Sequence, residues 1–153
     1  MKTPIKRSES LKPLSRDHHH GLLLCWKIRF GIKNNIQENR IKKYADWFYE
    51  YHLIPHFDLE EQHIFPILDA ENELTRKAIS EHRRLRRLFE SDAEIQKNLS
   101  LIEEELERHI RFEERILFNE IQRTATAQQL ETIALIHKED SFVDNLIDPF
   151  WEK

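Results

Sequence analysis

The chain of 153 residues is 39% hydrophobic and 34% charged, with only two glycines and five prolines, which is typical of one domain built from amphipathic helices. Its net charge of −4, with histidine neutral, argues against a nucleic-acid-binding protein, which usually carries a basic excess. The longest apolar run, residues 21–26, is too short to span a bilayer, and the basic, polar start does not resemble a signal peptide. With a single cysteine, we therefore expect a cytoplasmic protein with neither a disulfide nor a membrane partner.

The spacing of apolar residues predicts five helices. Residues 1–13 carry charge and proline without a helical period, so we expect a flexible arm there, followed by one domain over residues 14–153. Helices are expected over residues 16–35, with Ser15 as the N-cap, over 38–65, where Pro55 should bend or loosen the helix, and over 73–89. A fourth follows Asp92, and a short fifth spans 127–137. Four helices of about 30 Å make an up-down-up-down bundle, so the predicted fold is all-α with an extra C-terminal helix. The tail should dock on the outside of the bundle through Phe142, Ile147, Phe150 and Trp151.

Two segments, residues 56–66 and 109–119, repeat the pattern His-x-x-x-Glu-Glu-x-x-[Ile/Leu]-Phe. Residues four apart lie on the same face of a helix, so His56 with Glu60, and His109 with Glu113, each present an imidazole beside a carboxylate. Nitrogen ligands together with carboxylates that can bridge two metal ions are typical of non-haem iron or manganese sites in helical bundles. The repeat therefore predicts a metal centre.

Two further histidines lie on the apolar stripes of the first and third helices, so that each half of the chain supplies two imidazoles and one carboxylate. Burying an unpaired carboxylate costs free energy, and a metal cation is an efficient partner for it. This stoichiometry suits a pair of metal ions better than one zinc, which takes four ligands. The candidate metal ligands are His18, His56, Glu60, His82, His109 and Glu113.

Several positions leave an alternative open. In the triplet of residues 18–20 at most two histidines can face the core, so His19 is the alternative to His18. His52 lies four residues before His56 and could add a ligand or a hydrogen-bond donor, and Glu114 is the alternative to Glu113. The arginine-rich run over residues 83–87 could bind phosphate, but we prefer a solvated helix face opposite the glutamates of residues 103–107.

The segments LSRDHHHGLLLCWKIRFG, HLIPHFDLEEQHIFP, EHRRL and HIRFEERILF resemble the hemerythrin-like, or His-His-Glu, cation-binding domains over roughly residues 14–122. The resemblance implies a four-helix bundle that holds two non-haem iron ions, bridged by oxo and carboxylate groups, for oxygen or redox chemistry. Hemerythrins proper add a histidine where this chain has Arg86, and their fourth-helix carboxylate would correspond to Glu114. The chain therefore resembles the broader domain family more than the oxygen-storage proteins.

The expected function is a metal-binding protein for oxygen, nitric oxide or redox sensing, or for iron handling, with a small gas such as O₂ or NO as its ligand. No Gly-rich phosphate loop, nucleophile elbow or CxxC pair accompanies the metal centre, so we favour this function over a dedicated enzyme. The alternatives are a small oxidase or peroxidase-like enzyme, and a structural bundle whose site has degenerated. A sensor without an output domain would need a partner protein, and a homodimer is another possible assembly.

Overall fold

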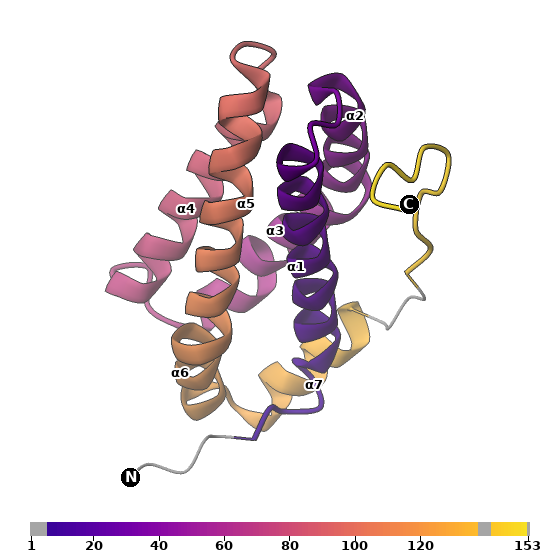
Figure 1. The fold of residues 1–153 in the computed structure, drawn as a ribbon. Helices are drawn as coiled ribbons and strands as arrows, with labels where there is room; N and C mark the ends of the chain where they lie inside the picture. Colours follow the sequence, from indigo (N-terminus) through magenta and orange to yellow (C-terminus); the bar gives the residue numbers. More distant parts are fainter. Residues whose placement is uncertain (1–5, 138–141, 153) are drawn as a thin grey trace, which may run out of the picture.

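A computed structural model describes residues 6–137 and 142–152, and within these ranges the secondary structure is helical, with no strand (Figure 1). The first long segment is α1 (Lys12–Lys33) and the second begins with α2 (Glu38–Phe48). The third is α4 (Glu73–Glu90), and the fourth begins with α5 (Ile95–Phe112) and ends with α6 (Phe118–Thr124). A short α7 (Ala127–Ile136) follows, so the predicted all-α bundle with an extra C-terminal helix is confirmed. None of the helices in the described ranges is long and apolar enough to cross a membrane.

The second segment remains helical through Pro55. A π-helical turn (Tyr49–Leu53) follows α2, and α3 (Ile54–Leu59) begins immediately before the proline. The Ile54 amide donates to the Tyr49 carbonyl, five residues back, so the helix is widened immediately before the proline, which removes one helical hydrogen bond. A second π-helical turn (Glu60–Ile64) and a 3₁₀ turn (Phe65–Ile67) complete the segment.

The first helix begins earlier than the sequence predicts. It starts at Lys12, after a fully buried Leu11, so the expected N-cap at Ser15 is wrong. The Ser15 hydroxyl donates instead to the Glu114 carboxylate at 2.8 Å. Arg7 donates to the side-chain oxygen of Gln122 at 2.8 Å, so this part of the expected arm lies against α6, whereas residues 1–5 are outside the described ranges.

The hydrophobic core has two clusters, with a polar layer between them. Along α1, His18 lies between Leu14, which belongs to one cluster, and Leu24, which belongs to the other. Along the fourth segment, His109 and Glu113 likewise lie between Leu106 in one cluster and Leu117 in the other. The buried polar residues therefore share one level of the bundle.

The C-terminal tail, described from residue 142, runs beside α2 (Figure 1). Phe150 is 3% exposed and belongs to the core, where it lies close to Gly31 of α1. Arg40 donates two hydrogen bonds to the carboxylate of Asp148, at 2.7 and 2.9 Å. The predicted docking of Ile147 is wrong, because its side chain is 87% exposed.

Candidate metal centre

The four helical segments bring all six candidate ligands into one buried cluster, where none is more than 5% exposed. His18 comes from α1, His82 from α4 and His109 from α5. His56 lies on α3, and Glu60 and Glu113 are each the first residue of a π-helical turn, Glu60–Ile64 and Glu113–Leu117. That these six residues bind metal stays a prediction, but the structure places them where one site would need them.

The first group of potential ligands contains His18, His56, Glu60 and Glu113, whose donor atoms all lie within 4.8 Å of one another. His18 Nε2 is 2.8 Å from Glu113 Oε1, and His56 Nε2 is 3.3 Å from Glu60 Oε2. The two imidazole Nε2 atoms are 3.1 Å apart. Two nitrogen and two oxygen donors therefore converge on one position.

The second group contains His82 and His109 together with the same two glutamates, again within 4.8 Å. His82 Nε2 is 3.2 Å from Glu60 Oε1, and His109 Nε2 is 3.3 Å from Glu113 Oε2. Each glutamate thus offers one oxygen to the first group and the other oxygen to the second. This arrangement suits two adjacent cations bridged by carboxylates.

The hydrogen bonding of the cluster is incomplete without a cation. Both carboxylate oxygens of Glu60, Oε2 of Glu113, and Nε2 of His82 and of His109 are buried and have no hydrogen-bond partner. Leaving such groups unsatisfied costs free energy, and imidazole nitrogens and carboxylate oxygens are established ligands of iron, manganese and zinc. The unpartnered atoms therefore fit a dinuclear metal site.

Opposite charges within the cluster shift the pKa values of His109 and Glu113 in opposite directions. Burial disfavours the protonated imidazole of His109, but the Glu113 carboxylate outweighs it and raises the pKa of His109 to about 10. For Glu113, burial alone would raise the pKa, yet the opposing charge of His109 holds it well below its usual range. The carboxylates of the cluster thus favour the protonated form of His109, as they would favour a cation.

The comparison with known protein families decides the identity of the domain. Residues 14–121 match the hemerythrin HHE cation-binding domain. The chain belongs to this family. The resemblance seen in the sequence is therefore confirmed, and the buried groups described above fit the binuclear metal site of an HHE domain. Neither the curated proteins nor the solved structures that were searched contain a match.

Every candidate histidine of this HHE domain is oriented by a second carboxylate at its Nδ1 atom, and the four distances lie between 2.7 and 2.9 Å. Such a contact fixes the ring and directs Nε2 toward a metal, although which nitrogen carries the proton is an assignment. Sequence reasoning missed these orienting carboxylates as a set. A local signal exists, since each is adjacent in sequence to a candidate ligand. The pairs are His18 with Glu114, His56 with Asp17, His82 with Glu61, and His109 with Glu81.

Each orienting carboxylate in turn faces a basic side chain. Arg86, which occupies the position of the additional histidine in hemerythrins proper, donates to Glu61 at 3.0 Å. His137 Nε2 lies 2.9 Å from Asp17. Lys77 pairs with Glu81, and Arg7 lies 3.8 Å from Glu114. The four orienting carboxylates thus surround the HHE centre, and the four basic side chains lie on the outer side of these carboxylates. In the arginine-rich run, Arg84 pairs with Glu105, as a solvated helix face predicts.

The paired glutamates of each repeat point in different directions, because consecutive residues of a helix are rotated by about 100° around its axis. Each pair lies at the start of a π-helical turn, Glu60–Ile64 or Glu113–Leu117. A π-helical turn widens the helix locally and is frequent at functional sites. Glu60 and Glu113 face the cluster, whereas Glu61 reaches His82 and Glu114 reaches His18. The structure therefore gives both glutamates a place: Glu113 belongs to both groups of potential ligands, and Glu114 contacts the other ring nitrogen of His18.

The other histidines considered from the sequence lie outside both groups of potential ligands. His19 is exposed. His52 is partly buried and packs against Trp47 and Phe142, with ring centroids 5.0 and 4.7 Å away. His52 therefore lines the cavity beside the HHE centre but does not belong to the groups of potential ligands.

Proposed function

We propose that this HHE-domain protein holds two non-haem iron ions and acts in oxygen, nitric oxide or redox sensing, or in iron handling. The observation that carries the proposal is that Glu60 and Glu113 are common to both groups of potential ligands. Each cation would meet two imidazole nitrogens and two carboxylate oxygens, a donor set that iron accepts and that leaves positions for a small ligand. Bound iron would supply reversible one-electron chemistry.

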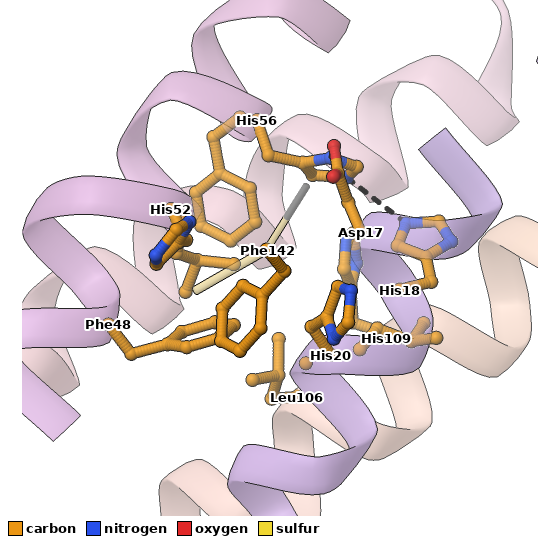
Figure 2. Close-up of a pocket in the computed structure, with 13 residues that line it drawn as sticks. Asp17, His18, His20, Phe48, His52, His56, Leu106, His109 and Phe142 are labelled. Atoms are coloured by element: carbon orange, nitrogen blue, oxygen red, sulfur yellow. Dashed lines mark hydrogen bonds and ion pairs between the residues drawn. The ribbon is translucent and has the colours of Figure 1, made fainter. Parts of the chain in front are cut away.

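A cavity beside the cluster supports a small ligand. Its volume is about 20 Å³, and His18, His56 and His109 are among the residues that line it (Figure 2). Most of its remaining wall is apolar, including Leu106 and Ile110. A space of this size holds roughly one molecule as large as water. A diatomic gas such as O₂ or NO is therefore the ligand that we propose.

We also propose that the protein is cytoplasmic, as its single cysteine suggests. The thiol itself is expected to have no catalytic role. Cys25 is fully buried, and burial raises the pKa of its thiol to about 12. A neutral, buried thiol is a poor nucleophile. As a sensor the protein would act through a partner protein or through a second copy of itself.

Elemental analysis of protein purified without chelators, together with its near-ultraviolet and visible absorption in air, tests the proposal. We expect two irons per chain and charge-transfer absorption that changes on reduction and on addition of nitric oxide. One zinc per chain, or no metal after reconstitution with ferrous iron, would identify a degenerate bundle instead. Catalytic consumption of an added reductant with oxygen would favour the oxidase or peroxidase-like alternative.

A further inference from the structure

A larger pocket lies next to the small cavity beside the cluster, and the two spaces share five lining residues. The larger pocket has a volume of about 460 Å³ and is lined by residues such as Pro13, Tyr51 and His137. We call the residues that line both spaces the partition. They are Asp17, His20, His52, His56 and Phe142.

Phe142 differs from the other members of the partition because it comes from the tail and not from the helical bundle. Its ring stacks on His20 with centroids 4.1 Å apart, and it lies 4.7 Å from the ring of His52 on the opposite side. Figure 2 shows the Phe142 ring between these two histidines, in front of Leu106 and beside the cluster. The Phe142 ring therefore packs against both imidazoles.

A partly buried charge network anchors the tail two residues beyond this ring. Lys27 of α1, only 7% exposed, lies 2.5 Å from Asp144 Oδ2 and donates to the Tyr44 hydroxyl at 2.8 Å. Tyr44 in turn donates to the other Asp144 oxygen at 2.5 Å. The ammonium group also lies 3.8 Å from the centre of the Trp151 ring. Hydrogen bonds to charged groups and cation–π contacts are strong when they are shielded from water, so these contacts of Lys27 and Asp144 hold the backbone next to Phe142 in place.

We propose that Phe142 determines which ligands reach the metal centre, admitting molecules of diatomic size and excluding larger ones, and that Asp144 holds it in this position. The identity of the ligand rests on the proposed function, whereas the position of the Phe142 ring between the two spaces is a property of the chain without metal. Removing the ring would merge the cavity of about 20 Å³ with the pocket of about 460 Å³. The size limit should then disappear.

The test compares Phe142→Ala with Val143→Ala, which alters the neighbouring side chain of the tail, 75% exposed. In iron-loaded protein, stopped-flow absorption would measure the association rates of nitric oxide and imidazole. Phe142→Ala should raise the imidazole rate about tenfold or more while changing the nitric oxide rate by less than about threefold. Asp144→Asn should act in the same direction, and Val143→Ala should match the wild type. An unchanged ratio of the two rates in Phe142→Ala would overturn the proposal.

A second measurement works without metal and separates this inference from the proposed function. Diethylpyrocarbonate modifies accessible imidazoles, and mass spectrometry can follow its reaction at His56, which is 5% exposed. In metal-free protein, Phe142→Ala should speed this modification about tenfold relative to Val143→Ala. Equal rates would show that Phe142 forms no barrier, even if iron binds. Faster modification in a chain that binds no iron would support the barrier and refute only the di-iron function.

Discussion

His18 contacts two consecutive glutamates, with Nδ1 at 2.7 Å from Glu114 Oε2 and Nε2 at 2.8 Å from Glu113 Oε1. The carboxylate at Nδ1 orients the ring, and the carboxylate at Nε2 faces the metal position. Substitution of either glutamate should therefore affect metal binding, but to different degrees.

Glu114→Gln should lower metal affinity by about 10–100-fold without changing the stoichiometry of the loaded protein, because the glutamine leaves both groups of potential ligands intact. Glu113→Gln should reduce the stoichiometry, because both groups include this carboxylate. Titration against a competing chelator, followed by elemental analysis, distinguishes the two. Equal effects of the two substitutions would contradict the separate roles.

His109→Ala should decrease metal content and lower the melting temperature of the loaded protein by roughly 5 °C or more, because a metal site contributes its binding free energy to folding. Glu120→Ala is the matched control on α6, since Glu120 is partly exposed and pairs only weakly with Arg123, at 3.5 Å. Elemental analysis and differential scanning calorimetry measure both effects. Wild-type loading in His109→Ala would rule out His109 as a ligand.

The stability of the metal-free protein should depend on pH through His109 and His56. The pKa of His109 rises from 6.5 to about 10 on folding, so its contribution to stability is complete below pH 6.5 and is lost as the pH rises through about 10. The pKa of His56 is also raised, against the effect of burial, by the Glu60 carboxylate, so it acts in the same direction.

We therefore expect the melting temperature of the metal-free protein to fall between pH 6.5 and 10. The loaded protein should show a weaker dependence, because a cation replaces the protons, and its metal affinity should increase with pH. Thermal scans of both forms across this interval check the prediction. A metal-free melting temperature that stays level or rises would contradict it.

Gly31→Ala should destabilise the junction of α1, α2 and the tail. A Cβ atom at Gly31 would lie 2.6 Å from Ile41 Cδ1 and 3.0 Å from the Phe150 ring. Overpacking of this kind costs about 1–3 kcal/mol, more than the roughly 1 kcal/mol that alanine gains over glycine in a helix. Urea unfolding should show a net loss of about 1 kcal/mol. Ile41→Val removes the Cδ1 methyl but keeps the carbon that lies 2.9 Å away, so it should suppress only part of the loss in the double variant.

Much of this protein was predictable from its sequence, because the relevant signals are local and periodic. The apolar spacing predicted α4 as residues 73–89, against the observed Glu73–Glu90, and α7 as 127–137, against Ala127–Ile136. The His-x-x-x-Glu repeats predicted two imidazole–carboxylate pairs, since residues four apart share a helix face in any context. The position of His18 on an apolar stripe indicated a buried histidine, which the structure contains.

Tertiary structure decided the features that depend on contacts between segments distant in sequence. Leu11 extends α1 past the expected N-cap because it packs into a core cluster that includes Phe118. The orienting role of Glu114 depends on α1 lying against the fourth segment, since its partner His18 is 96 residues away. A helical period specifies which residues share a face but not which face of another helix they meet.

The two π-helical turns and the place of Phe142 are the clearest cases. A hydrophobic pattern of period 3.6 contains no sign that the helix widens at Glu60 and Glu113. The pattern also left Glu113 and Glu114 as alternatives, whereas the structure brings both into contact with His18. Phe142 was expected to dock, but only the fold shows that it does so against His20 and His52, beside the metal positions. Residue types and their spacing were enough to indicate which groups could bind metal. Packing between segments decided how those groups are oriented, paired and enclosed, because these contacts join residues that no local pattern relates.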